Sequence, residues 1–387
     1  MKISILTPDF SHNCFGRAWL LAKVLQRHYD VEMIGPAFGD GIWKPLENAC
    51  DFDIKMVKGY ASGQFEFRKM LNMISGDVIY ASKPLMASFG VGLVKKIRNR
   101  KPLILDIDDQ ELGFGKEFYD SLIWPKKIND FLLSISNWRS YYYALILNKL
   151  IRFANTLTVS GKILQAQYGG TIIWHGRDVD TFNPKKFDKN ELKRKYLPDR
   201  DKKSFIVGFI GTPKPHKGLE DLIDAIGVLK NESFLLMIVG TDENSYCQNL
   251  KQRVKNSILK DRVIFFPQQP FEKLPEFLAI TDLVVIPQAE RAASYGQVPA
   301  KIFDAMAMTK PIIATNISGL PEILDGCAWI VDPGNPKQLA ETIQYIFNYP
   351  IEAVEMGLKA REKFKREYSW DVMGERLISI FEKYQTK

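Results

Sequence analysis

The chain has 387 residues, of which 46% are hydrophobic and 25% charged, as is typical of soluble proteins with full-sized cores and two to three domains. Its formal charge of +8 favours anionic partners such as nucleotides, phosphorylated glycans or an acidic membrane surface, and the lack of a dense Lys/Arg stripe argues against nucleic acid. The four cysteines lie far apart with no C-x-x-C pair, which argues against a zinc site and a disulfide framework. The sequence contains no run of about 18 apolar residues, so we predict no membrane span.

Short apolar runs alternate with helical patterns along the whole chain. In the first half, the predicted strands are 2–8, 31–36, 77–82, 102–108 and 156–160, and the predicted helices are 16–28, 65–75, 86–99 and 127–153. In the second half, the predicted strands are 204–211, 234–240, 262–266, 283–287, 311–315 and 328–332. Near-continuously apolar strands separated by helices are typical of parallel sheets covered on both faces.

A polar, proline-punctuated stretch separates the two series of strands. We therefore predict an α/β protein of two Rossmann-like domains that face each other across a cleft. The predicted divisions are a first domain at 1–180, a linker at 181–203, a second domain at 204–367, and a C-terminal helix at 368–387 that packs back toward the first domain. In open parallel sheets, ligands bind beyond the carboxyl ends of the strands, so the loops there are the candidate sites.

The segment "GFIGTPKPHKGLEDLIDAI" joins a buried strand to an amphipathic helix that begins near Gly218. Gly211 and Thr212 lead into the turn. Lys217 lies at the helix N-terminus, where backbone N–H groups and the helix dipole favour an anion. This composition is typical either of a phosphate socket or of an ordinary strand–helix turn with solvated charges.

The segment "SYGQVPAKIFDAMAMTKPIIATNISGLPEIL" contains a second candidate anion site. Pro299 suits the first position of a helix, which leaves the N–H groups of Ala300 and Lys301 free to bind an anion. The Asp304 carboxylate in the following turn can accept hydrogen bonds from two ribose hydroxyls. The alternative is that Lys301 and Asp304 form a surface ion pair three residues apart.

The second half resembles the nucleotide-sugar-binding domain of retaining glycosyltransferases of family 4, which have the GT-B fold. The two segments above match the family's phosphate-loop and [ED]-A-M-A-x-x-K-P runs, and "IIWHGRDVDTFNP" and "YSWDVMGERL" match two more of its motifs in the same order. The "PAKIFD" helix resembles a subgroup of the family with P-x-K at this place. The first half matches the family only in layout.

The resemblance implies a donor site for a nucleoside-diphosphate sugar. Lys217 would hold the diphosphate and Asp304 the ribose, while the loops after Gly240 and around Gln268 would contact the base. The loop around Gly16, in the first domain, would approach the donor from the other side. The implied donor-binding residues are Gly16, Gly211, Thr212, Lys214, Gly240, Gln268, Pro299, Ala300 and Lys301.

The chain departs from the family at two positions of this site. Thr212 stands where the family usually has Arg, and a neutral hydroxyl cannot replace a guanidinium on a diphosphate. Gly296 stands where the family has the first Glu of its E-x7-E pair. Lys214, Lys301 or Arg291 would have to supply the missing positive charge.

Three carboxylates follow the fourth predicted strand in "LDIDDQE", at Asp106, Asp108 and Asp109. They are typical of an acceptor or catalytic site, of an ordinary strand end, or of a site for Mg²⁺ or Mn²⁺. Because the resemblance implies a metal-independent mechanism, we expect no metal and no cofactor. His12, close to Gly16, is a further catalytic candidate beside Asp108, Asp109, Lys217 and Asp304.

The predicted helix at 127–153 carries an apolar and aromatic stripe with basic residues around it, and "KKIRNRK" lies elsewhere in the same domain. The stripe consists of Trp124, Ile128, Phe131, Ile135, Trp138, Tyr142 and Leu145. Such a stripe is typical of a core-facing helix. The alternative is a face that rests on an anionic membrane and takes a lipid-linked acceptor.

We therefore expect a cytoplasmic retaining glycosyltransferase that moves a hexosyl group from a UDP- or GDP-sugar to a hydroxyl of a glycan or lipid-linked acceptor. Peripheral contact with the inner face of a membrane is compatible with this expectation. Two alternatives stay open: a nucleotide-sugar epimerase on the same fold, and a binding protein that takes the donor without catalysis.

Overall fold

The structure is a computed structural model that describes residues 1–113, 136–198 and 204–385. The chain forms two compact units. Unit 1 comprises Met1–His175, Tyr295–Val298 and Asp371–Lys387, and unit 2 comprises Gly176–Ser294 and Pro299–Trp370. Both units are parallel-sheet α/β structures, which confirms the predicted fold class.

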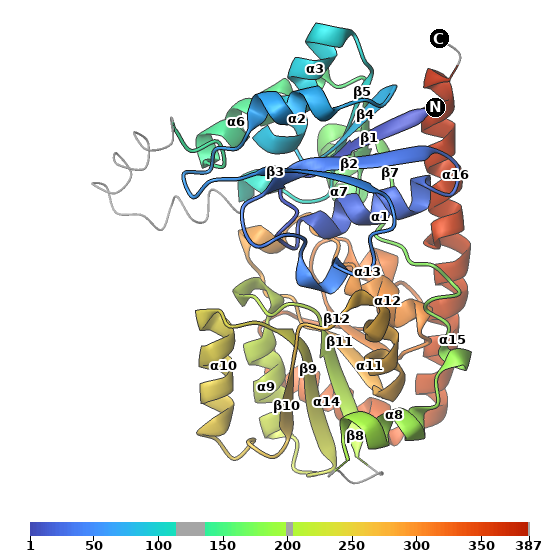
Figure 1. Ribbon diagram of the computed structural model, residues 1–387. Helices are drawn as coiled ribbons and strands as arrows, with labels where there is room; N and C mark the ends of the chain where they lie inside the picture. The colour runs from blue at the N-terminus through green and yellow to red at the C-terminus, as the bar shows by residue number, and fades with distance from the viewer. Residues whose placement is uncertain (114–135, 199–203, 386–387) are drawn as a thin grey trace. The chain divides into compact units, whose positions relative to one another are not determined.

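Unit 1 is built on a seven-stranded parallel sheet with the strand order β3-β2-β1-β4-β5-β6-β7 (Figure 1). The strands are β1 (Lys2–Leu6), β2 (Asp30–Ala37), β3 (Asp53–Lys58), β4 (Val78–Ser82), β5 (Leu103–Ile107), β6 (Thr156–Val159) and β7 (Thr171–Ile172). The helices are α1 (Phe15–Leu25), α2 (Phe67–Met73), α3 (Val91–Asn99), α6 (Tyr141–Leu150), α7 (Lys162–Tyr168) and α16 (Trp370–Phe381). The shorter turns are η1 (Lys44–Leu46), the π-helical η2 (Met86–Gly90), η3 (Ile151–Phe153) and η8 (Glu382–Tyr384).

Unit 2 is built on a six-stranded parallel sheet with the order β10-β9-β8-β11-β12-β13. The strands are β8 (Phe205–Ile210), β9 (Phe234–Thr241), β10 (Val263–Pro267), β11 (Leu283–Ile286), β12 (Ile312–Thr315) and β13 (Trp329–Val331). The helices are α8 (Lys189–Tyr196), α9 (Leu219–Val228), α10 (Ser245–Lys255), α11 (Leu274–Ile280), α12 (Lys301–Ala307), α13 (Leu320–Ile323), α14 (Pro336–Asn348) and α15 (Pro350–Glu367). The 3-10 turns are η4 (Pro184–Lys186), η5 (Pro215–Lys217), η6 (Phe271–Lys273) and η7 (Ala292–Ser294).

Each unit has its own hydrophobic core, because its central strands are apolar on both faces. All eight residues of β9 are buried, and so are all five of β5. In unit 2, helix α9 packs Leu222, Ile223 and Ile226 into the core at helical spacing. The carboxyl ends of the strands and the loops after them are thereby held in place, and the candidate site residues lie at these strand ends, on the loops or in the first turn of a following helix.

The structure corrects the predicted elements in three places. Strands β3 and β7 were not predicted, because β3 is a largely half-exposed edge strand and β7 has only two residues. The predicted helix at 127–153 is wrong over 136–140, which form turns, since the extended backbone of Ser140 lets helix α6 begin only at Tyr141. Its part at 127–135 lies outside the described residues, as do Trp124, Ile128, Phe131 and Ile135 of the stripe.

Two further regions bear on the predicted divisions of the chain. The described part of 181–203, expected as a linker, contains η4 and α8, and α8 packs against α11 within unit 2. The C-terminal residues from Asp371 onward group with unit 1. Within the three described ranges, no helix is both long enough and apolar enough to cross a membrane.

Candidate functional site

Two glycines at the carboxyl ends of β8 and β9 allow neighbouring groups of unit 2 to approach closely. A side chain at Gly240, where φ is +110°, would meet the carbonyl group of Gly211 at 2.8–2.9 Å. A side chain at Gly211, where φ is +140°, would lie 3.1 Å from Nζ and Cε of Lys301. A Cβ at Gly211 would therefore crowd the lysine head, and a Cβ at Gly240 would displace the Gly211 backbone.

Lys301 holds its ammonium group in an unusual environment. Its Nζ is buried, has no hydrogen-bond partner, and lies 3.5 Å from the centre of the Phe209 ring. Burial lowers the pKa of Lys301 well below its usual range, and the nearby charge of Lys217 lowers it further against an opposing effect of Asp304. An anion bound beside this glycine turn would reduce the repulsion between the two lysines.

The loop that carries Lys217 is tied to the loop after β11. Gly218 has φ of +63° at the start of α9, and a Cβ there would overlap the Pro287 carbonyl oxygen. The backbone N–H of Ala289 and the hydroxyl of Ser294 both donate to the carbonyl of His216. Thr212, Lys214 and Lys217 are half-buried in this fixed loop.

Asp304 contacts an arginine that was not predicted as a site residue. Its Oδ1 lies 2.5 Å from Nε of Arg177, and both side chains are buried. The Arg177 guanidinium lies over the rings of Phe182 and Phe271 at 5.9 and 5.4 Å. Burial raises the pKa of Asp304, and Arg177 opposes that rise. A ribose would therefore have to share this carboxylate with Arg177.

The remaining donor-side residues lie on the same edge of the unit 2 sheet. Ala300 is the N-cap of α12, directly after the buried Pro299. Gln268 follows β10, and its backbone N–H donates to Thr241 at the end of β9. Gly296, the position of the missing Glu, groups with unit 1 and lies beside Gln110.

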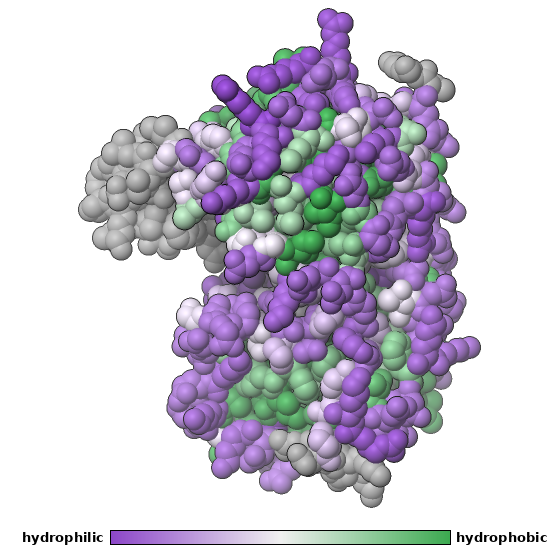
Figure 2. Space-filling view, in the orientation of Figure 1, coloured by the Kyte–Doolittle hydropathy of each residue, from purple (hydrophilic) through white to green (hydrophobic). Residues whose placement is uncertain are grey.

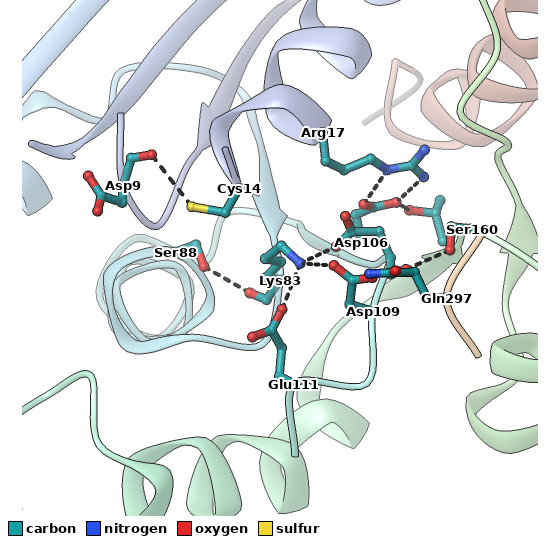
Figure 3. Close-up of polar contacts among 12 residues, drawn as sticks. Asp9, Cys14, Arg17, Lys83, Ser88, Asp106, Asp109, Glu111, Ser160 and Gln297 are labelled. Atoms are coloured by element: carbon teal, nitrogen blue, oxygen red, sulfur yellow. Dashed lines mark hydrogen bonds and ion pairs between the residues drawn. The ribbon is translucent and has the colours of Figure 1, made fainter. Parts of the chain in front are cut away.

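Unit 1 contains a cluster of charged side chains beyond the ends of β4 and β5 (Figure 3). The Nζ of Lys83 lies 2.8 Å from Asp108 Oδ1, 2.8 Å from Asp109 Oδ2 and 2.6 Å from Glu111 Oε1. Gln297 donates to the other oxygen of Asp109 at 3.1 Å. Lys83 is 4% exposed and has φ of +70°, a conformation that non-glycine residues adopt rarely and that is often found at functional sites.

The cluster separates the pKa values of its two aspartates. Burial raises the pKa of Asp108 to about 7, although Lys83 opposes the rise. Burial also disfavours the charge of Asp109, but Lys83 and the Gln297 donor outweigh it and hold that pKa well below its usual range. Burial would lower the pKa of Lys83, but the three carboxylates hold it well above its usual range. Two neighbouring carboxyls with pKa values moved apart are a common arrangement for acid–base chemistry.

The third predicted carboxylate, Asp106, has a structural contact. It accepts from Nε and Nη2 of Arg17, each at 2.8 Å, and from the Thr158 hydroxyl at 2.7 Å. Arg17 also donates to the carbonyls of Ile173 and Trp174, so this buried pair joins α1, β5 and the chain after β7. His12 is exposed on the loop before α1, and Gly16 lies in the first turn of that helix.

The acidic cluster also bears on the metal alternative. Oxygens of Asp108, Asp109 and Glu111 lie within 4.8 Å of one another, a spacing that fits a divalent ion. All three, however, contact the Lys83 ammonium at hydrogen-bond distance. The three carboxylates could therefore bind a cation, but the Lys83 ammonium already occupies that position.

Several site residues were missed by sequence reasoning. Lys83 directly follows the buried strand β4, so the rule that searches strand ends would have found it. Arg177 lies after the short, half-buried strand β7, which was not predicted, so the same rule would have missed it. Glu111 follows two carboxylates that were predicted. Gln297 could not be found, because it is nearly 190 residues from Asp109 in sequence.

Residues 188–363, most of which lie in unit 2, match the profile of the family described as Glycosyl transferases group 1. An uncharacterized glycosyltransferase of Methanocaldococcus jannaschii is 29% identical over 44% of this chain and 46% of its own length. The capsular polysaccharide biosynthesis glycosyltransferase CapM of Staphylococcus aureus is 23% identical over 82% of this chain and 80% of its own. The chain thus spans about half the length of the first of these relatives.

Solved structures match the chain over nearly its full length. HepE of Anabaena, in complex with UDP and glucose, has a TM-score of 0.77 and 20% identity, with 99% of each chain covered. At this identity the likeness concerns the fold, and it confirms the GT-B fold predicted from the sequence.

Proposed function

We propose that the protein is a retaining glycosyltransferase that transfers a hexosyl group from a UDP- or GDP-sugar to a hydroxyl of a glycan or lipid-linked acceptor. The family match of unit 2, the CapM relative and the likeness to a UDP-bound structure support the class of enzyme. The proposed donor site lies in unit 2 and the proposed acceptor residues in unit 1.

The observation that carries the proposal is the buried ammonium of Lys301. It has no hydrogen-bond partner and lies near a second lysine, at the glycine ends of β8 and β9. A diphosphate would supply the missing negative charge and hydrogen-bond acceptors. As the bond between sugar and phosphate breaks, negative charge grows on the diphosphate, and Lys217 and Lys301 would stabilise it.

The acceptor side rests on the acidic cluster. Carboxylates that are held by Lys83 and Gln297 suit the hydroxyl groups of a sugar acceptor, which donate hydrogen bonds. No metal is needed on this proposal, because lysines stabilise the leaving group and the Lys83 ammonium already lies among the three carboxylates. We also propose peripheral contact with an anionic membrane, in keeping with the net charge of +8.

Thermal unfolding with UDP, GDP and their sugars tests the donor site. Lys301→Met should raise the unfolding temperature of the ligand-free protein, because it removes a buried amino group without a hydrogen-bond partner, and should abolish the nucleotide-induced rise. Lys310→Met is a matched control, because Lys310 also lies half-buried in unit 2 but its Nζ donates to the carbonyls of Ala279 and Thr281. This control should unfold at a lower temperature and keep the nucleotide-induced rise.

A full nucleotide-induced rise in the unfolding temperature of Lys301→Met would show that Lys301 is not part of the donor site.

A turnover assay separates the transferase from the two alternatives, the binding protein and the epimerase. Lys217→Ala should reduce transfer about 10²–10³-fold while the fold stays intact. A selective nucleotide shift without any turnover in the wild-type chain would favour the binding protein, and product released without an acceptor would favour the epimerase.

A further inference from the structure

Unit 1 has a pocket that is separate from the acidic cluster. Its volume is about 640 Å³, and its main lining residues are Phe65, Phe67, Arg68, Lys69, Met86 and Trp138. It is a depression that is largely open to solvent and not an enclosed cavity. The pocket draws on α2, the strand-end loop before it, η2 and the turn before α6.

The wall of the pocket is aromatic and mutually supported. Trp138 packs edge-on against Phe65 and Phe67, with ring centres 5.1 and 6.0 Å apart, and the two phenylalanine rings lie 5.9 Å from each other. Phe65 is 4% exposed, so the cluster is anchored in the core of unit 1. Aromatic rings and the flexible Met86 thioether side chain form an apolar surface that a hydrocarbon chain can contact.

The rim of the pocket is positively charged. Glu66, the acidic residue of the lining, pairs with Lys69 at 3.0 Å and accepts from the backbone N–H of Lys58, so its charge is compensated. Arg68 is exposed beside it. Elements α2, α3, α6 and η3 carry basic and no acidic side chains, and the basic ones are Arg68, Lys69, Lys95, Lys96, Arg98, Lys149 and Arg152.

Large apolar side chains are exposed on these same elements. Ile97 of α3 is 78% exposed, Ile146 of α6 is 55% exposed and Phe153 of η3 is 48% exposed. Lys96 ties α3 to η3 by donating to the Phe153 carbonyl at 2.7 Å. Figure 2 shows hydrophobic and hydrophilic residues interspersed over the part of unit 1 where α2 and α3 lie in Figure 1. Exposed apolar groups among basic residues are typical of surfaces that lie on anionic membranes.

We propose that this pocket takes the apolar chain of an anionic lipid held in a membrane. The aromatic wall would receive the hydrocarbon, and Arg68 with the basic residues of α2 and α3 would face the anionic headgroups. This inference rests on the membrane contact in the proposed function, and it specifies the class of lipid that the protein contacts. It does not depend on which nucleotide the donor site binds.

Vesicle binding of the full chain tests the proposal. The probes are vesicles of phosphatidylcholine alone and of phosphatidylcholine with phosphatidylglycerol, in which the phosphatidylglycerol acyl chains are brominated and quench nearby tryptophans. The protein should bind the anionic vesicles, and its tryptophan fluorescence should fall. Most of the quenching should be lost in Trp138→Phe. The matched control is Trp43→Phe, which replaces a half-buried tryptophan elsewhere in unit 1 and should keep the quenching of the wild type.

A second pair of variants tests the charged rim. Arg68→Glu should weaken binding to anionic vesicles about tenfold or more, because it replaces an attractive charge with a repulsive one. Lys359→Glu, an exposed site on α15 of unit 2, should leave binding unchanged. Anionic binding with the same quenching in Trp138→Phe would overturn the pocket and leave a surface contact only. No binding to anionic vesicles would overturn the pocket and the membrane contact together, while the nucleotide shifts would still report on the donor site.

Discussion

At the residue scale, the charged cluster of unit 1 makes stability depend on pH. Burial raises the pKa of Asp108 from 3.8 to about 7, so between these values the folded chain binds a proton that the unfolded chain has lost. The stability from this group is full below about pH 4 and is lost as the pH rises through about 7. Asp109 has the opposite sign, because its lowered pKa contributes stability that is lost on acidification.

Asp108→Asn should remove the first of these effects. The amide oxygen can still lie beside the Lys83 ammonium but carries no charge, so the variant should be more stable than the wild type at about pH 8 and similar to it near pH 4. Urea unfolding across this range measures the difference. Asp109→Asn is the matched control and should be less stable than the wild type at about pH 8. The same pH slope in the wild type and in Asp108→Asn would contradict the assignment.

The sequence predicted which residues lie at strand ends better than it predicted their partners. Asp108 and Asp109 were chosen because they follow a buried strand, but their common partner Lys83 follows a different strand. Asp304 was chosen from a family motif, and its contact with Arg177 joins residues more than 120 positions apart. Partners that are distant in sequence depend on the tertiary fold, which periodicity and motif spacing do not encode.

At the scale of elements, the junction between β8 and α9 depends on Gly218. Its φ of +63° and the Pro287 carbonyl oxygen leave no room for a Cβ. Gly218→Ala should therefore lower the free energy of unfolding by about 2 kcal/mol or more and reduce the nucleotide-induced shift, because the Lys217 loop must move.

Helix α9 supplies the control for this prediction. A Cβ at Gly227 would make only an ordinary contact of 3.7 Å with Leu259. Gly227→Ala should stabilise the protein by up to about 1 kcal/mol, because alanine favours the helix. Chemical unfolding measures both variants, and equal effects would show that Gly218 has no special steric role.

Elements were predictable from the sequence where burial is complete. The central strands of both sheets are near-continuously apolar, and each was predicted within two residues of its ends. The edge strand β3 was missed, because it is half-exposed and has no clear apolar run. The start of α6 was misplaced, because the apolar spacing continues across the turn at 136–140, where the backbone does not.

At the scale of the whole molecule, the chain passes from unit 1 to unit 2 and returns to complete the first. Residues from Asp371 onward group with unit 1, and Phe381 near the end of α16 is fully buried. Its ring lies 5.6 Å from Tyr80 of β4 and 5.7 Å from Tyr29. The core of unit 1 therefore depends on a segment that lies more than 200 residues beyond β6 and β7 in sequence.

Phe381→Ala should lower the stability of unit 1 by about 3–5 kcal/mol, because it opens a cavity among these rings. Phe364→Ala is the matched variant in unit 2, since Phe364 is also fully buried. If the two cores unfold separately, calorimetry should show two transitions, each lowered by one of the variants. UDP or GDP should mainly raise the transition that Phe364→Ala lowers, because Lys217 and Lys301, which are proposed to hold the diphosphate, both lie in unit 2. A nucleotide that raises the transition lowered by Phe381→Ala would place donor contacts in unit 1, and a single transition lowered by both variants would show that the two cores unfold together.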